Sequence, residues 1–152
     1  MELLTPSSLA GRIGASLGTS AWITIDQPRI DEFARCTGDG QWIHCDRDRA
    51  RRESPFGSTV AHGFLTLSLV APTFFEMIAW KLAVRQVVNY GLEKVRFLAP
   101  VRAGKRVRNH IKLLALEEKG EGRHLLTTEH TIEIEGESRP ALVAVQLAYL
   151  TE

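Results

Sequence analysis

The segment from Phe64 to Trp80 constrains the fold more than any other part of the sequence. Its apolar side chains recur at helical spacing and also fill the other faces of that helix. A helix that is apolar nearly all round is surrounded by protein. The segment also contains Pro72 and Glu76, and it falls short of the roughly 20 apolar residues that a membrane span needs. We therefore expect a buried central helix, which Pro72 can kink.

The second half of the chain has the pattern of strands. Apolar and polar residues alternate over 107–113, 128–134 and 143–149, and glycines mark the breaks between these stretches. Half-buried antiparallel strands have this period of two. We expect a further strand over 84–97, bent or bulged at 89–91. A strongly curved antiparallel sheet wrapped around one long helix is an α+β architecture.

The first half predicts shorter elements. A strand at 20–25 precedes a helix that Asp26 can cap and that Gly38 can end. Asp46 can cap another short helix, which runs to about Glu53. The 152 residues contain no repeat, low-complexity tract or linker. We therefore expect a single domain over 1–152.

Charge and cysteine content exclude several classes of function. The chain has 19 Lys and Arg against 18 Asp and Glu, a formal net charge of +1. Such a balance gives no general attraction to nucleic acid or membranes. The N-terminus lacks the pattern of a signal peptide, and Cys36 and Cys45 have no metal-binding or redox spacing. We expect a cytoplasmic protein with two reduced thiols that binds neither nucleic acid nor membrane.

Asp39 and His44 are the first candidates for chemistry. They lie five residues apart, just after the expected helix stop at Gly38. If the residues between them form one loose turn, both side chains can face one pocket and hold one water. General acid–base catalysis needs such a pair. On spacing alone, the alternative that Asp39 caps a helix and His44 bonds a backbone carbonyl is favoured.

The dipeptide His62-Gly63 is the second candidate, because it precedes the buried helix. Glycine lets a ligand approach the backbone, and a helix N-terminus offers unpaired N–H groups. Such groups suit an oxygen that develops negative charge. The structural alternative is that Gly63 permits close packing while His62 makes a structural hydrogen bond, and without further context it is favoured.

Other chemistries have weaker support. His44, Cys45, Asp46 and His62 match no zinc signature, so we expect no metal and no cofactor. Arginines in the 47–52 segment could meet phosphate groups, but acidic residues interrupt them and favour a solvated helix face. The chain has no nucleophile elbow and no glycine-rich phosphate loop.

Taken together, these motifs resemble the MaoC-like dehydratase family, which includes (R)-specific enoyl-CoA hydratases. The resemblance extends over nearly the whole chain, and is closest to the branch named after nodulation protein N. It is carried by Phe33-x4-Gly38-Asp39-x3-Ile43-His44-x5-Ala50, by Phe56-Gly57 and Val60-Ala61-His62-Gly63-Phe-Leu-Thr-Leu67, and by Asn89-Tyr-Gly-Leu-Glu-Lys-Val-Arg-Phe97 with Pro100.

The resemblance implies a hot-dog fold and a homodimer whose acyl cleft lies near the subunit interface. It also implies that Asp39 and His44 form the catalytic pair, while the Gly63 N–H binds the thioester oxygen. The expected reaction is hydration of a trans-2-enoyl-CoA to the (R)-3-hydroxyacyl-CoA. The expected substrate contacts are Gln41, Trp42, His62, Phe64 and Asn89.

The chain departs from the common hydratase motif at Gln41 and Trp42, where the family usually has Asn and Pro. This change puts substrate choice in doubt and motivates an alternative, a non-catalytic protein that binds acyl-CoA or another small molecule. A serine that some hydratases carry on the central helix corresponds to Ala71. A third alternative is an acyl-CoA thioesterase, for which Glu76 would be the only carboxylate on the central helix.

Overall fold

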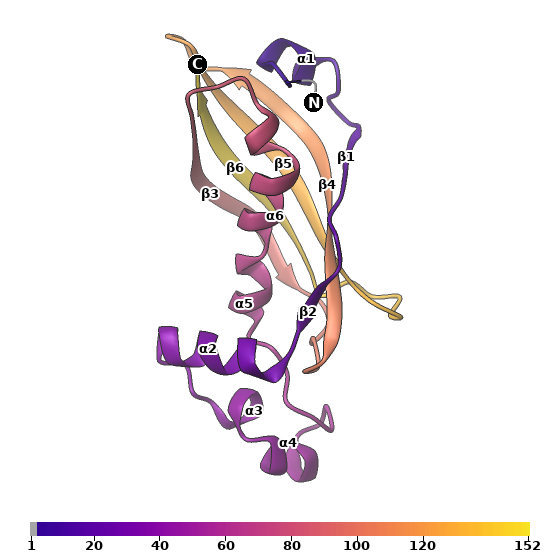
Figure 1. Cartoon of the computed structure of the whole chain (residues 1–152). Helices are drawn as coiled ribbons and strands as arrows, with labels where there is room; N and C mark the ends of the chain where they lie inside the picture. The colour runs from indigo at the N-terminus through magenta and orange to yellow at the C-terminus, as the bar shows by residue number, and fades with distance from the viewer. Residues whose placement is uncertain (1–2) are drawn as a thin grey trace.

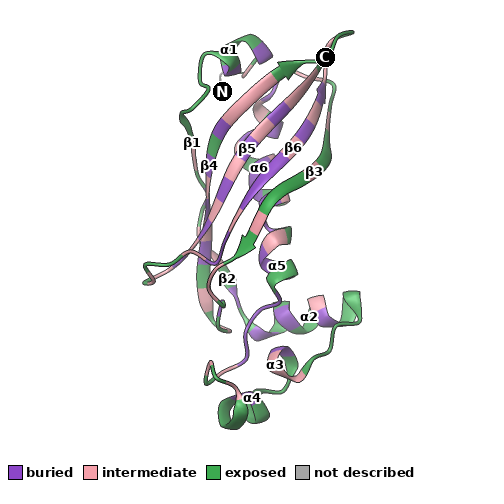
Figure 2. Cartoon of the chain, turned by 180° about the vertical axis from the view of Figure 1, so that it is seen from behind, coloured by how far each residue is buried: buried purple, intermediate pink, exposed green. Residues whose placement is uncertain are grey.

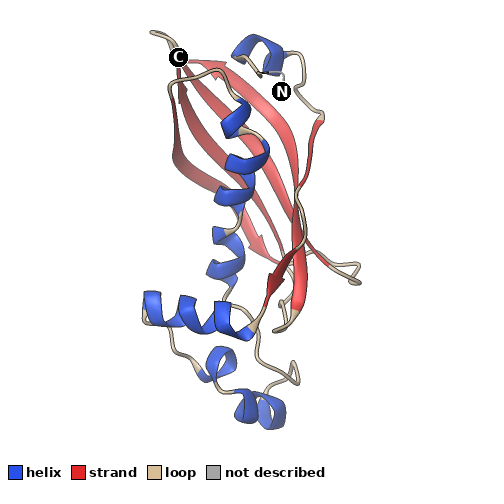
Figure 3. Cartoon of the chain, in the orientation of Figure 1, coloured by secondary structure: helices blue, strands red, loops and turns tan. Residues whose placement is uncertain are grey.

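The computed structural model describes residues 3–152, whose strands form one six-stranded antiparallel sheet in the order β1-β4-β5-β6-β3, with β2 also paired to β4. Figures 1 and 3 show this sheet curving around a helical segment. Its strands are β1 (Ser16–Thr19), β2 (Ile23–Ile25), β3 (Gln86–Phe97), β4 (Lys105–Glu118), β5 (Arg123–Ile134) and β6 (Leu142–Thr151). The expected strands and the α+β architecture are therefore confirmed.

The helical segment consists of α5 (Gly63–Ser68), α6 (Val70–Met77) and the 3-10 helix η1 (Ala79–Lys81). It breaks at Leu69, three residues before Pro72. Proline has no N–H to donate to the carbonyl of Ser68, and its ring crowds that carbonyl. The interruption predicted from Pro72 is therefore present, one turn before the proline itself.

The apolar character of this segment is explained by the sheet. The sequence predicts that this segment has too few apolar residues for a membrane span, but by length and composition alone the helix formed by residues 63–81 could cross a membrane. Here they lie along the concave face, where Leu65, Phe74 and Ile78 are at most 5% exposed. Buried residues alternate along β5 and β6, as the purple bands in Figure 2 show. Their apolar side chains form clusters with those of this helix. The segment is the core helix of the described structure.

Three short helices cover one end of the sheet: α2 (Gln27–Thr37), α3 (Trp42–Cys45) and α4 (Arg47–Glu53). Asp26 and Asp46 cap α2 and α4 by accepting hydrogen bonds from the backbone N–H groups of Arg29 and Arg49, at 3.1 and 2.9 Å. Both predicted caps are confirmed. The helix α3 was not predicted, because four residues are too few to show a periodic pattern.

Two more short elements escaped prediction, namely α1 (Pro6–Ala10) and β1. The helix α1 lies at the opposite end of the sheet from α2, near the C-terminus (Figure 1). Its Leu9 is fully buried in an apolar cluster that also contains Phe74, Ile78 and Leu113. The prediction of a single domain over 1–152 stays a prediction.

The strand β3 forms an edge of the sheet and carries the predicted irregularity. Its register against β6 shifts between Asn89 and Gly91, and again between Glu93 and Arg96. A bulge places an extra residue on one strand and increases its local twist. The bend expected at 89–91 is confirmed. The second irregularity, between Glu93 and Arg96, was not predicted from the sequence.

A buried histidine on β5 gives a testable pH dependence of stability. His130 is fully buried, and this burial lowers its pKa from 6.5 to about 4. Between these values the unfolded chain binds more protons than the folded chain, so the stabilisation present above pH 6.5 is lost as the pH falls toward 4. The loss should be roughly 3 kcal/mol. Urea unfolding of the wild type and of His130→Gln, measured from pH 7 to pH 4, checks this expectation.

The variant removes the imidazole and keeps a polar side chain, so the comparison cancels the titration of other groups. The wild type should lose more free energy of unfolding than His130→Gln over this range. Parallel curves for the two proteins would contradict a buried, neutral His130.

Candidate active site

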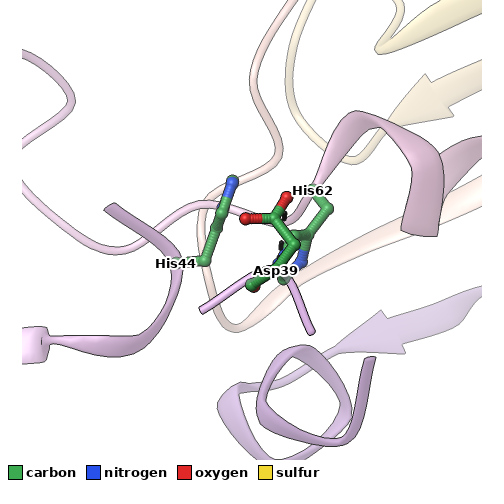
Figure 4. A group of neighbouring side chains, drawn as sticks. All are labelled: Asp39, His44 and His62. Carbon is green, nitrogen blue, oxygen red and sulfur yellow. Dashed lines mark hydrogen bonds and ion pairs between the residues drawn. The ribbon is translucent and has the colours of Figure 1, made fainter. Parts of the chain in front are cut away.

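Three titratable side chains meet at the start of α5. One polar atom from each of Asp39, His44 and His62 lies within 4.8 Å of the other two (Figure 4). Asp39 follows the end of α2, His44 belongs to α3, and His62 directly precedes α5. The structure therefore brings together the two motifs that the sequence singled out separately.

The end of α2 positions Asp39. Gly38 adopts a left-handed conformation with φ of 82°, and its N–H bonds the carbonyl of Ala34 at 2.8 Å. This conformation favours glycine and turns the chain sharply out of the helix. The Asp39 side chain is 53% exposed, and one of its oxygens accepts a long 3.4 Å hydrogen bond from the Gln41 N–H. Its carboxylate stays accessible to a ligand.

His44, in contrast to Asp39, is buried, with only 8% of its surface exposed. Its Nδ1 lies 2.6 Å from the carbonyl oxygen of Val60. A carbonyl can only accept a hydrogen bond, so Nδ1 carries the proton and Nε2 keeps its lone pair. Burial is the largest effect on the pKa of His44 and lowers it, followed by the Val60 hydrogen bond, which raises it. The imidazole is therefore neutral near pH 7, and its Nε2 carries the free lone pair.

A buried glutamine fixes the backbone beneath His44. The Gln27 amide donates to the His44 carbonyl at 2.7 Å, and its oxygen accepts from the Thr59 hydroxyl at 2.5 Å. Gln27 thereby connects α2, α3 and the segment that leads into α5. Sequence reasoning missed this residue because its partners lie 17 and 32 positions away.

His62 lies behind the pair, with only 3% exposure. Its Nε2 donates to the backbone carbonyl of Asp39 at 2.9 Å. Its ring stacks on His44 with centroids 3.8 Å apart, and lies 5.0 Å from the ring of Phe33. His62 therefore holds the backbone of Asp39 and packs against the imidazole of His44. The predicted substrate contact of this residue stays a prediction.

The same three groups could also be considered as metal ligands. However, the His44 and His62 rings are nearly parallel, with an interplanar angle of 25°. Imidazole binds metal through a lone pair in the ring plane, so stacked rings direct their lone pairs along nearly parallel lines. The geometry favours proton transfer over metal binding.

Gly63 is the exposed first residue of α5. Its N–H makes no hydrogen bond within residues 3–152. A Cβ at this position would come within 3.0 Å of the Phe97 ring, so glycine permits that ring to pack here. The packing role considered from sequence and the availability of the N–H group are thus compatible.

The remaining predicted contacts fall into two places. Gln41 and Trp42 lie beside the pair, where Gln41 precedes α3 and the Trp42 ring packs 4.3 Å from the Arg49 guanidinium. Phe64 and Asn89 instead line a cavity of about 420 Å³ between the helical segment and β3. All four assignments as substrate contacts stay predictions.

Comparison with known proteins agrees with this arrangement. The MaoC like domain family model matches residues 8–135. Nodulation protein N of Rhizobium leguminosarum bv. viciae is 46% identical over 144 residues, which cover 95% of this chain and 89% of that protein. The 3-hydroxyacyl-thioester dehydratase Z of Mycobacterium tuberculosis is 46% identical over 138 residues, covering 91% and 90%. The structure of a monoamine oxidase regulatory protein from Archaeoglobus fulgius aligns with a TM-score of 0.84 and 23% identity, covering 100% and 99%.

The curved sheet around one helix is the hot-dog fold, and the relatives named above identify the chain as a hydratase or dehydratase of this fold. The chain belongs to the MaoC-like dehydratase family. This membership confirms the resemblance read from the motifs at 33–50 and 56–67.

The electrostatics of the pair can be measured directly. We expect the pKa of His44 to lie below 6.5 because of burial. Asp39→Asn should lower it further, since the negative charge of Asp39 raises the pKa of His44. NMR titration of the imidazole signals, assigned with His44→Gln, checks both directions. A His44 pKa above 6.5, or one that rises in Asp39→Asn, would be inconsistent with this site.

Proposed function

We propose that this protein catalyses the reversible, (R)-specific hydration of trans-2-enoyl thioesters, with coenzyme A as the carrier. The observation that carries this proposal is the geometry of His44 next to Asp39. A neutral imidazole offers a free Nε2 lone pair beside an accessible carboxylate. Such a pair can bind and deprotonate one water.

The reaction follows from these two groups. The Asp39 carboxylate accepts one hydrogen bond from the water and orients it, while His44 Nε2 takes the other proton. The water oxygen attacks the β-carbon, and the electrons of the double bond move toward the thioester carbonyl. The imidazolium then returns its proton to the α-carbon on the same face. Water is added across the double bond, and His44 is neutral again.

Gly63 supplies the third element of the proposal. The carbonyl oxygen of the thioester gains negative charge when water adds to the β-carbon. An N–H group that is already exposed can donate to that oxygen without reorganisation. The Gly63 N–H fits this role, because it is accessible and makes no other hydrogen bond in the described chain.

The alternative activities receive less support. Glu76, the only acidic residue of the 63–81 segment, is exposed to solvent. A thioesterase that used this carboxylate would have no site around it. A non-catalytic binding protein would not need a deprotonated His44 Nε2 next to Asp39, so the hydratase is the better interpretation.

We also propose that the protein forms a homodimer, and that it is a soluble, cytoplasmic enzyme of acyl metabolism. The edge strand β3 is mainly exposed in Figure 2. It carries several large apolar side chains that are 46–63% exposed, namely Val88, Tyr90, Leu92 and Phe97. Apolar side chains on an open edge favour association with another sheet.

The catalytic proposal is tested by loss of enoyl absorbance with crotonyl-CoA and longer enoyl-CoAs. Asp39→Asn and His44→Gln should each lower kcat/KM at least about 100-fold, the usual contribution of one acid–base group. Chiral chromatography of the product should give the (R) alcohol.

Asp48→Asn is the matched control, because this carboxylate is 79% exposed on α4. It should hydrate at the wild-type rate. Wild-type turnover no faster than that of Asp39→Asn and His44→Gln would sink the catalytic assignment.

The dimer is tested by light scattering coupled to size exclusion. The wild type should elute with twice the mass of one chain, whereas Val88→Glu should shift toward the monomer because it places a charge in an apolar contact. Val88→Thr, a similar shape without charge, should stay dimeric. A monomeric wild type would refute the proposed dimer, and the catalytic proposal for Asp39 and His44 would be unaffected.

A further inference from the structure

A second cavity, of about 300 Å³, lies between α4 and the segment that leads into α5, and we call it the α4 cavity. Its volume is at the lower end of the usual range of small-molecule sites, so it suits one end of a larger ligand. Two charged side chains of α4 line it, together with part of the loop after α4 and the ends of two neighbouring elements. The lining residues are Asp26, Gln27, Arg47, Arg51, Gly57, Ser58, Thr59, Ala103 and Gly104.

The arginines of α4 differ in what they contact. The Arg49 guanidinium bonds the Glu53 carboxylate at 2.9 Å. In contrast, the Arg47 side chain makes no hydrogen bond or ion pair within residues 3–152. The Arg51 guanidinium has one distant ionic contact, 3.6 Å from the Asp48 carboxylate, and both of these side chains are more than 70% exposed. Both guanidiniums that line the α4 cavity are thus available to a ligand.

Arg47 and Arg51 are also placed so that their charges repel each other. They lie four residues apart on α4. Residues at this spacing are neighbours on one face of a helix, where like charges destabilise it. A phosphate group between the two guanidiniums would replace this repulsion with charge-assisted hydrogen bonds, because each planar guanidinium can bond two phosphate oxygens.

The other polar groups of the α4 cavity leave its lining positive overall. Asp26 contributes one carboxylate, which already accepts a hydrogen bond from the Arg29 N–H as the cap of α2. The Gln27 amide oxygen and the Thr59 hydroxyl bond each other. The backbone N–H of Ser58 makes no hydrogen bond within residues 3–152. Two arginines therefore outweigh one aspartate, and the lining favours an anion with several acceptor oxygens.

A paired ribbon of chain leads from the α4 cavity toward Gly63. Residues 59–61 run antiparallel to residues 101–103, and backbone hydrogen bonds join the two segments. Side chains alternate between the two faces of such a paired segment. Thr59, which lines the α4 cavity, therefore lies on the same side of the ribbon as Ala61 and Gly63.

A third cavity, of about 260 Å³, lies at the Gly63 end of this ribbon. Its lining includes Ala61, Gly63 and residues 97–101. Five residues lead from Ser58, in the lining of the α4 cavity, to Gly63, a distance of at most about 18 Å. The pantetheine arm of coenzyme A, which joins its sulfur to its phosphates, spans a comparable distance when it is extended. One coenzyme A molecule is therefore long enough to place its thioester at Gly63 and its phosphates in the α4 cavity.

We propose that the α4 cavity binds the phosphate groups of the coenzyme A carrier. Arg47 and Arg51 donate hydrogen bonds to the phosphate oxygens, while the pantetheine arm follows the ribbon to the thioester at Gly63. The inference rests on the proposed function, because it assigns the carrier end of the same substrate. Since the phosphates take no part in the reaction, these contacts should lower KM and leave kcat nearly unchanged.

The test compares the crotonyl thioesters of coenzyme A and of pantetheine, which has the same arm without phosphate groups. The wild type should have a KM at least about 10-fold lower for crotonyl-CoA, the usual value of one charge-assisted hydrogen bond. In the double variant Arg47→Met and Arg51→Met the two KM values should become similar, because methionine cannot donate to a phosphate.

Arg52→Met is the matched control, because it removes the same charge from α4 at a position outside the cavity lining. It should keep the wild-type ratio of the two KM values, which excludes a general effect of net charge. All three substituted arginines are exposed, so the variants should fold, and thermal unfolding checks this.

Calorimetric binding of coenzyme A, pantetheine and inorganic phosphate separates the possible failures, because it needs no turnover. Coenzyme A should bind the wild type at least about 10-fold more tightly than pantetheine, and the double variant should lose this difference. Equal binding and equal KM values in the wild type would overturn this inference and leave the hydratase intact. Binding of inorganic phosphate that depends on Arg47 and Arg51, with an unchanged affinity for coenzyme A, would indicate a site for the free ion and would also overturn it. Arginine-dependent binding of coenzyme A without hydration of any enoyl thioester would instead overturn the proposed function alone.

Discussion

The packing of the helical segment 63–81 against the concave face of the sheet determines where everything else lies. The sheet presents alternate apolar side chains along each central strand, and this one helix covers them. Because the helix is buried, its first residue, Gly63, is held at a defined place at one end of the sheet. The short helices α2 and α3 lie at that same end (Figure 1). The proposed acid–base pair, Asp39 and His44, therefore lies on the support that the core helix provides.

The proposed roles of Asp39 and His44 depend on the different solvent exposure of their two side chains. Asp39 keeps a half-exposed carboxylate, while His44 is buried with its Nδ1 bonded to Val60. That single hydrogen bond selects the tautomer, and burial keeps the ring neutral. Gln27 and His62 add no reactive group, but they fix the backbone at His44 and at Asp39 respectively. The proposed chemistry thus requires a rigid support as much as the two reactive residues.

Buried polar side chains form a second level of organisation inside the core. Hydrophobic packing alone would favour one continuous apolar cluster, yet Asn109, His130 and Gln146 interrupt it on three adjacent strands. Their positions alternate correctly with the inward-facing apolar residues, so the strand pattern tolerates them. What they require is a partner for each polar atom, and the Asn109 amide meets this need by donating to both His130 and Thr73.

The sequence alone determined the local elements and singled out Asp39, His44 and Gly63 as the candidate reactive residues. The caps at Asp26 and Asp46, the stop at Gly38, the four long strands and the bulge at 89–91 are encoded by neighbours in the chain. Such signals are read from spacing. Only the tertiary structure decided which nitrogen of His44 is basic, that His62 supports Asp39, and that Gln146 meets Asn89 across 57 positions. These contacts join residues distant in the chain, and a pattern of period two or 3.6 carries no information about them.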